Sequence, residues 1–195
     1  TTEVNDSTRW RYGSITKVFT AVMILQLESE GKLSIDDSVT KYIDLKQHNA
    51  AGITIKHLLN HSSGLYNYTA SKKLKWEDTP NQCLENSLKR KLNFTPGSKY
   101  DYCNTGYVIL GLIIEKITAQ SYQQNITERI FKPCGLESMI YCSDDKIPFN
   151  TARGYKIKHN KYTDFTEIDH SWANSAGAVL GNLTDLNKFV DCLFK

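Results

Sequence analysis

The chain has 195 residues, of which 40% are hydrophobic, 23% charged and 11% aromatic. This is the composition of an ordinary globular protein, so it excludes wholesale disorder, a collagen-like fibre and a coiled coil. The length predicts a single domain with a core of its own. The formal net charge of +3 is too small to indicate nucleic-acid binding. No apolar run reaches the roughly 18 residues that a membrane span requires.

The chain begins at Thr1, without an initiator Met and without a signal peptide. We therefore expect a mature form or an excised piece of a longer gene product.

The first predicted helix begins near Ser14. The apolar run over 18–27 is too long for a strand, and Glu30-Gly31 supplies the glycine typical of a helix end. The mixed polarity of 33–42 predicts a loop with a short helix.

Thr54 is expected to cap a second helix that stops at Ser63-Gly64. A third helix follows Thr79-Pro80, a cap with proline at the first helical position. It would place four apolar side chains on one side, namely Cys83, Leu84, Leu88 and Leu92.

The remaining predicted helices cover much of the second half of the chain. Thr105 opens an apolar helix through 107–117, and Ser121 caps another to about Phe131. The polar stretch 141–169 predicts loops with one or two strands. A last helix is expected after Thr184-Asp185. The predicted content is mostly helical, with few convincing strands.

Five cysteines lie at 83, 103, 134, 142 and 192, without a CxxC motif or zinc-site spacing. The pattern favours buried or free thiols. One disulfide with leftover thiols is the alternative, and the sequence does not pair the residues. No metal or other cofactor is indicated.

Ser14 and Lys17 form the first candidate pair for catalysis. Residues three apart share one face of a helix. At the first turn of the helix, backbone N–H groups and the helix dipole favour negative charge. The apolar neighbours of Lys17 would lower its pKa, so its amine could take the proton of the Ser14 hydroxyl. A capping serine and a snorkelling lysine are the alternative interpretation.

Tyr102 and Asn104 form the second candidate pair, just before a predicted helix. A tyrosine near ammonium groups can act as a general base. The Asn104 amide could bind a substrate carbonyl or orient Lys17. A packing tyrosine and a capping asparagine are the alternative.

Taken in order, four motifs resemble the serine β-lactamase and penicillin-binding-protein superfamily. They are Gly13-Ser14-Ile15-Thr16-Lys17, Leu58 to Leu65 (LLNHSSGL), Phe94-Thr95-Pro96-Gly97 and Tyr102 to Tyr107 (YCNTGY). The likeness is greatest to the branch of class C β-lactamases, D-alanyl-D-alanine carboxypeptidases and related esterases. It extends through 152–155, 175–177 and 183–186, and so covers nearly the whole chain.

The resemblance implies a role for each candidate residue. Ser14 is the expected acylated nucleophile, and its N–H would form half of the oxyanion hole. Lys17 is the expected activating partner. Tyr102 would shuttle protons and protonate the leaving group, and Asn104 would contact the substrate amide. His61 invites a triad with Ser14, which we reject because in the family this histidine lies in a structural turn.

Two family elements are missing from the sequence. No Lys-Thr-Gly occurs, and only residues 1–13 precede the Ser14 motif, where the family has a β-hairpin. The fold class expected for 1–195 is therefore α+β, mostly helical: one incomplete β-lactamase/transpeptidase-like domain that lacks most of its antiparallel sheet. Helix faces meant for that sheet would be left apolar and exposed. The missing strands could come from the rest of the gene product or from a partner.

The first functional hypothesis is a serine hydrolase that forms an acyl-enzyme on Ser14. Its expected substrates are β-lactams, D-Ala-D-Ala peptides of peptidoglycan or small esters. The second is a catalytically incomplete family member, or a fragment of a larger enzyme, that acts as a binding or interaction module. The resemblance implies the periplasm or cell envelope, although five cysteines fit an oxidising compartment poorly.

Overall fold

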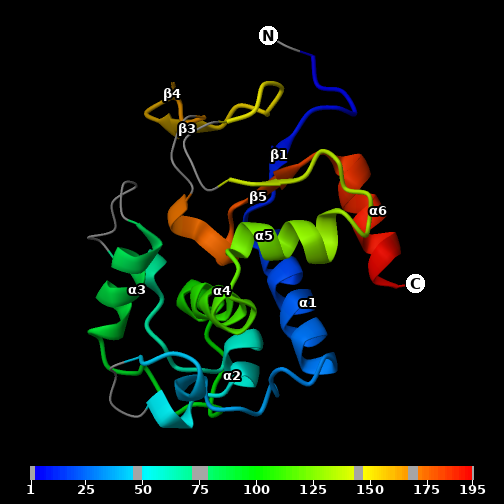
Figure 1. Cartoon of the computed structure of the whole chain (residues 1–195). Coiled ribbons are helices and arrows are strands. Elements are labelled where there is room, and N and C mark those ends of the chain that lie inside the picture. Colours follow the sequence, from blue (N-terminus) through cyan, green and yellow to red (C-terminus); the bar gives the residue numbers. More distant parts are fainter. Residues whose placement is uncertain (1–2, 46–49, 72–78, 143–146, 167–170, 195) are drawn as a thin grey trace.

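A computed structural model describes residues 3–45, 50–71, 79–142, 147–166 and 171–194 (Figure 1). Within these ranges the α-helices are α1 (Thr16–Ser29), α2 (Ile55–Leu59), α3 (Pro80–Leu88), α4 (Asn104–Thr118), α5 (Tyr122–Ile126) and α6 (Leu183–Leu193). Shorter helical turns are η1 (Gly13–Ile15), η2 (Val39–Lys41), η3 (Ala50–Gly52), η4 (Tyr68–Ala70), the π-helical η5 (Thr127–Phe131) and η6 (Ser171–Ala176). The strands are β1 (Trp10–Arg11), β2 (Ile140–Tyr141), β3 (Tyr155–Lys158), β4 (Lys161–Asp164) and β5 (Val179–Gly181).

Helices α1 and α4 supply much of the core. Both carry apolar side chains on several faces, which is typical of buried helices. Burying one such side chain contributes roughly 1.5–3 kcal/mol. The fully buried large side chains of these two helices are Phe19, Met23, Ile24, Leu27, Ile109, Leu110, Ile113 and Ile114.

Helix starts follow the capping residues in most places. Thr54, Thr79 and Ser121 each accept a hydrogen bond from the backbone N–H three residues on, as predicted. The last helix is present, but its predicted cap was wrong: Asn182 caps α6 and accepts from the Asp185 N–H at 2.8 Å.

Three predicted helix boundaries need correction. Helix α2 ends at Leu59 rather than at Ser63-Gly64, because His61 turns the chain with a positive φ of 60°. Helix α3 ends at Leu88, so Leu92 lies beyond it. Helix α4 begins at Asn104, one residue before the expected start.

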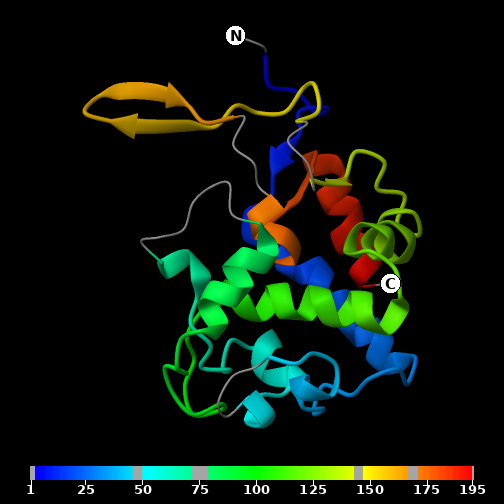
Figure 2. The ribbon, with the colours of Figure 1, turned by 60° about the vertical axis from the view of Figure 1, so that its left-hand side comes forward.

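Three short strands form an antiparallel sheet in the order β1-β5-β2. This sheet is the small sheet component of the expected α+β fold. Strands β3 and β4 form a separate hairpin, as the polar stretch predicted, and all eight of its strand residues are exposed. The hairpin projects from the helical body in Figure 2.

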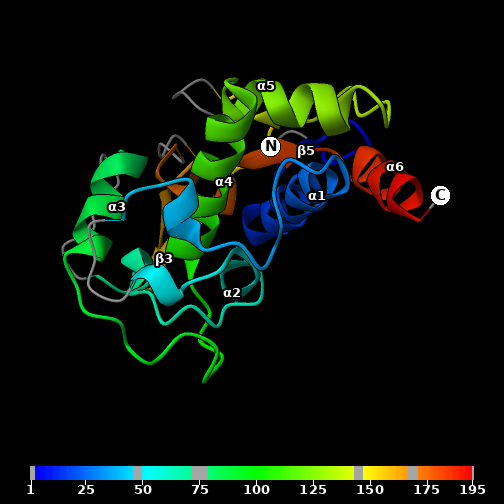
Figure 3. The same ribbon diagram turned by 60° about the horizontal axis from the view of Figure 1, so that its bottom comes forward.

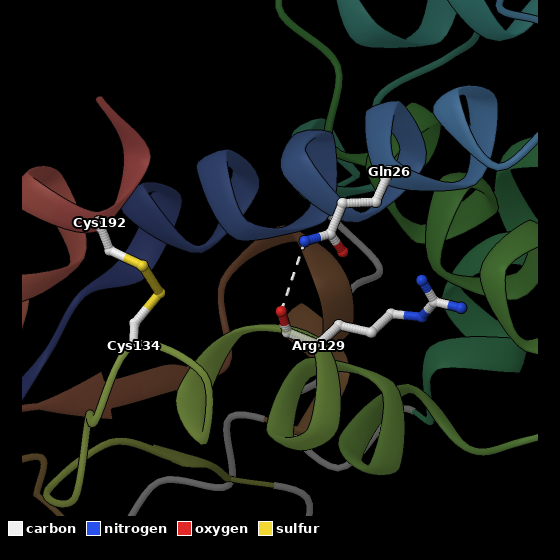
Figure 4. Close-up of a disulfide and its surroundings, with 4 residues drawn as sticks. All are labelled: Gln26, Arg129, Cys134 and Cys192. Carbon is white, nitrogen blue, oxygen red and sulfur yellow. Dashed lines mark hydrogen bonds between the residues drawn. A yellow bond between two sulfur atoms is a disulfide. The ribbon is translucent and has the colours of Figure 1, made fainter. Parts of the chain in front are cut away.

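Helix α6 lies beside α1 (Figure 3), where the Phe189 ring stacks on the Phe19 ring with 4.2 Å between centroids. A disulfide between Cys134 and Cys192 ties α6 to the segment after η5 (Figure 4). The alternative of one disulfide is therefore correct, and the other three cysteines are buried.

Several apolar side chains are exposed on α1 and α6. They include Val18, Leu25, Leu183, Val190 and Leu193.

Candidate active site

Ser14 lies in the η1 turn that leads into α1, and its side chain is exposed. Gly13 precedes it with a φ of +52°, a conformation that glycine adopts without steric cost. Strand β5 holds both sides of this turn. The Tyr12 N–H donates to the Val179 carbonyl at 3.0 Å, and the Val179 N–H donates to Thr16 Oγ1 at 3.1 Å.

Lys17 is buried one turn after Ser14, and its ammonium has three acceptors. Nζ donates to Ser14 Oγ at 3.1 Å, to Asn104 Oδ1 at 2.8 Å and to the Ala176 carbonyl at 2.7 Å. An ammonium has three N–H donors, so this set satisfies the charged form completely. After loss of one proton, two N–H groups can keep the carbonyl acceptors. The nitrogen lone pair then faces Ser14 Oγ.

Burial lowers the pKa of Lys17 from its ordinary value of 10.5 to about 8. The aromatic rings of Tyr102 and Tyr107 lie 5.0 and 5.4 Å from Nζ and partly offset the cost of burying the charge. About a tenth of the amine is therefore neutral at pH 7, and about half at pH 8. A neutral amine next to Ser14 is the arrangement that a general base requires.

Tyr102 lies just before α4 and reaches Ser14 from there. Its hydroxyl donates to Ser14 Oγ at 2.6 Å. Its ring is 38% exposed, so the hydroxyl lies where solvent or a ligand can reach it. Ser14 Oγ thus lies within hydrogen-bond distance of both an amine and a phenol.

The Asn104 amide is held in one orientation by two side chains. Its Nδ2 donates to Thr69 Oγ1 at 3.1 Å and to Asn67 Oδ1 at 3.4 Å. The amide oxygen is thereby directed at Lys17. The resemblance implies that Asn104 contacts a substrate amide; donation from Nδ2 would require one of these partners to be exchanged, whereas Oδ1 has a second lone pair.

The η6 turn presents the Ala176 carbonyl to Lys17. Asn174 breaks the helical geometry of this turn with a φ of 41° and a ψ of −137°. The Ser175 hydroxyl donates to the Tyr107 carbonyl at 2.8 Å, and the Thr20 hydroxyl donates to the Ser175 carbonyl at 2.7 Å. Hydrogen bonds from α4 and α1 therefore fix the position of η6.

The four residues singled out from the sequence meet at one place: Ser14, Lys17, Tyr102 and Asn104. Sequence reasoning gave no role to the Ala176 carbonyl, nor to Asn67 and Thr69. A backbone carbonyl has no side-chain signature, and nothing in the sequence around Asn67 points to Asn104.

The His61 ring is hydrogen-bonded to a backbone N–H, whereas a catalytic triad would require the Ser14 hydroxyl as its partner. Its Nδ1 accepts from the Cys103 N–H at 3.2 Å.

Among the described residues, no group of three or more His, Cys, Asp or Glu side chains could hold a metal ion. In the same part of the chain, no helix is both long and apolar enough to cross a bilayer.

Residues 1–194 match the sequence profile of the family described as Beta-lactamase. The chain belongs to this family. It is 32% identical to the putative penicillin-binding protein PbpX of Bacillus subtilis, over 97% of this chain and 47% of PbpX. It is 28% identical to the protein flp of Staphylococcus aureus, over 96% of this chain and 39% of flp.

Solved structures of this family share the fold. A D-stereospecific amidohydrolase from Streptomyces superposes with a TM-score of 0.88 at 30% identity, covering 99% of this chain and 63% of that one. A D-amino acid amidase from Ochrobactrum anthropi gives a TM-score of 0.86 at 29% identity, covering 98% and 57%. The expected β-lactamase/transpeptidase-like fold is confirmed. The chain spans 39–50% of the length of the curated relatives named flp, PbpX and FimD.

Proposed function

We propose that this chain carries the acylation centre of a serine hydrolase, with Ser14 as the nucleophile. The observation that supports this most strongly is the hydrogen bonding of one exposed hydroxyl to both a buried amine and a phenol, at 3.1 and 2.6 Å. The low pKa of Lys17 argues against the alternative of a binding module, because a lysine kept only for structure has no need of a desolvated amine near a hydroxyl.

In the proposed reaction, the neutral Lys17 amine takes the proton of Ser14 as Oγ attacks the substrate carbonyl carbon. The Ser14 N–H donates to the oxyanion that develops, and such a donor contributes about 2.7–4 kcal/mol in the transition state. Tyr102 gives its proton to the leaving nitrogen or oxygen as that bond breaks, and recovers a proton from Lys17. Water then cleaves the Ser14 ester and releases the acid.

The proposed substrates are β-lactams, D-Ala-D-Ala peptides or small esters. The similarity to solved structures of D-amino acid amidases favours D-amino acid amides as a further class. The names of the penicillin-binding relatives support a site in the cell envelope, and so does the disulfide, which an oxidising compartment favours. In that setting the proposed partners are peptidoglycan peptides and small acyl compounds.

The test is covalent labelling with a fluorescent penicillin, read by intact mass and peptide mapping, together with turnover of D-phenylalanine amide. We expect one adduct on Ser14 and none in Ser14→Ala. Ser29→Ala, which removes another exposed serine of the same helical segment, should label like the wild type. A folded chain that gains no adduct at millimolar penicillin, and hydrolyses neither the amide nor a p-nitrophenyl ester, would overturn the proposal.

A further inference from the structure

His61 makes three contacts with the segment that carries Tyr102. The Asp101 N–H donates to the His61 carbonyl at 2.9 Å, and the Cys103 N–H donates to His61 Nδ1 at 3.2 Å. The imidazole also lies against the Tyr102 ring, with 4.5 Å between centroids and 38° between planes. His61 therefore holds the backbone N–H of the residue on each side of Tyr102 and also packs against the Tyr102 ring.

The backbone of His61 is in the left-handed region, with a φ of 60°. Positive φ is uncommon for residues other than glycine, although asparagine, aspartate and histidine adopt it more often than the rest. The side chain has a task that glycine could not perform, because its ring nitrogen accepts the Cys103 N–H.

That hydrogen bond fixes the protonation state of the ring. An imidazole nitrogen accepts a hydrogen bond only when it carries no proton, so His61 must be neutral with its proton on Nε2. Protonation would place an Nδ1–H against the Cys103 N–H, where two donors face each other. The same event would add a positive charge near Lys17.

We propose that neutral His61 is a positioning residue that holds Tyr102 and Asn104 against Ser14 and Lys17, and that its protonation releases this segment and switches acylation off. This inference rests on the proposed function for its effect on rate, but the contacts on which it depends do not involve a substrate.

The surroundings of the ring favour the neutral form. Burial, and then the charge of Lys17 from α1, lower the pKa of His61 below its ordinary 6.5. The other titratable groups around it are Tyr107 of α4 and Tyr100, Asp101, Tyr102 and Cys103 of the preceding loop; His57 of α2 lies one helical turn earlier. A folded-state pKa below the unfolded one means that neutral His61 is stable above pH 6.5. The three contacts of His61 with residues 101–103, here called the clamp, weaken as the pH falls below that value.

The first test is the pH dependence of the second-order rate constant for labelling by fluorescent penicillin. Below pH 8, Lys17 alone makes the logarithm of the rate fall by one unit per pH unit. Protonation of His61 should steepen this slope to two on the acid side of its folded-state pKa, which lies below 6.5. His61→Asn keeps an acceptor and tolerates positive φ but does not titrate, so its slope should stay at one.

Two further variants separate the clamp from simple packing. His61→Phe keeps the ring stacking but loses the acceptor, and should label roughly 10- to 100-fold more slowly at every pH because a shift of about 1 Å in a catalytic group costs this much. His57→Asn removes a neighbouring imidazole whose Nδ1 accepts from the Thr54 N–H at 3.2 Å, and should keep the slope of two. A slope of two in His61→Asn, or wild-type rates in His61→Phe, would overturn the inference.

The second test needs no substrate. Amide hydrogen exchange of Cys103, corrected for the intrinsic pH dependence, should show protection at pH 7.5 that is lost at an acidic pH below the folded-state pKa of His61, while core amides of α4 stay protected. In His61→Asn the protection should be equal at both pH values. If penicillin labels nothing but this switch is present, the proposed function fails and the clamp stands. Equal protection of the wild-type amide at both pH values would refute the clamp.

Discussion

The ammonium of Lys17 donates at 2.7 Å to the carbonyl of Ala176, a residue 159 positions further along the chain. This contact, together with that to Asn104 Oδ1, fixes two of the three hydrogen-bonding directions of Nζ. The third hydrogen-bonding direction of Nζ points to Ser14 Oγ. The reactivity proposed for the hydroxyl therefore depends on two carbonyl oxygens, one from α4 and one from η6, that orient the Lys17 amine.

The pH dependence of labelling should follow the titration of Lys17. Its pKa is lowered to about 8, and the neutral amine is the form that accepts the proton of Ser14. The labelling rate constant should therefore rise with pH and level off above about 8. Stopped-flow fluorescence with a labelled penicillin between pH 6 and 10 measures this. A rate that does not change from pH 7 to 9 would exclude Lys17 as the base.

Tyr102→Phe should slow acylation by roughly 10²–10⁴-fold, the usual contribution of a general acid or base. Its free energy of unfolding should change by less than about 0.5 kcal/mol, because the hydroxyl meets Ser14 at an exposed position. Rapid-quench labelling and urea denaturation give the two values. Tyr100→Phe, at a tyrosine that is 71% exposed, is the matched control and should match the wild type in both. Equal rates for the two variants would remove Tyr102 from the mechanism.

Gly111→Ala should weaken both stability and acylation, although alanine favours a helix by roughly 1 kcal/mol. An added Cβ at Gly111 would lie 2.2 Å from Ser175 Oγ and 2.7 Å from Ser175 Cβ, so η6 must move. Overpacking of this kind costs roughly 1–3 kcal/mol, and the movement would withdraw the Ala176 carbonyl from Lys17.

Gly106→Ala in the same helix is the control for the Gly111 variant. Its added Cβ would meet Leu58 at 3.5–3.6 Å, which is ordinary van der Waals contact. It should keep or raise the melting temperature, as followed by circular dichroism. A Gly111→Ala protein with the melting temperature of Gly106→Ala would show that η6 is not packed as described.

Reduction of the disulfide should lower the free energy of unfolding by up to about 4 kcal/mol, the loop-entropy value for a closure of this length. The two cysteines are 58 positions apart, and they tie α6 to the segment after η5. Urea denaturation with and without a phosphine reductant measures the difference. The Cys134→Ser, Cys192→Ser double variant should unfold at the reduced midpoint under both conditions, and a reductant effect on this variant would contradict the assignment.

Local signals in the sequence located the helices well but their ends less well. Thr54, Thr79 and Ser121 were found because a cap side chain acts within three residues of itself. Asn182 was missed because Thr184 and Asp185, two further cap-forming residues, follow within three positions. The end of α2 was missed because a positive φ at a histidine has no signature in the sequence.

The site was predictable where its residues are close in the sequence or share the family's motifs. The spacing of Ser14 and Lys17 gave their pairing, and the resemblance placed Tyr102 and Asn104 with them. The Ala176 carbonyl and the partners of Asn104 come from tertiary packing, which no spacing reveals. The pairing of Cys134 with Cys192 has the same origin, since it depends on how α6 docks beside α1.

Ser14 and Tyr102 are 88 positions apart and are joined by one hydrogen bond. In an unfolded chain Ser14 is an ordinary alcohol, no more nucleophilic than any other serine. Any selective chemistry at this position therefore exists only in correctly assembled molecules, so the fraction of a preparation that a probe modifies would report how much of it is native.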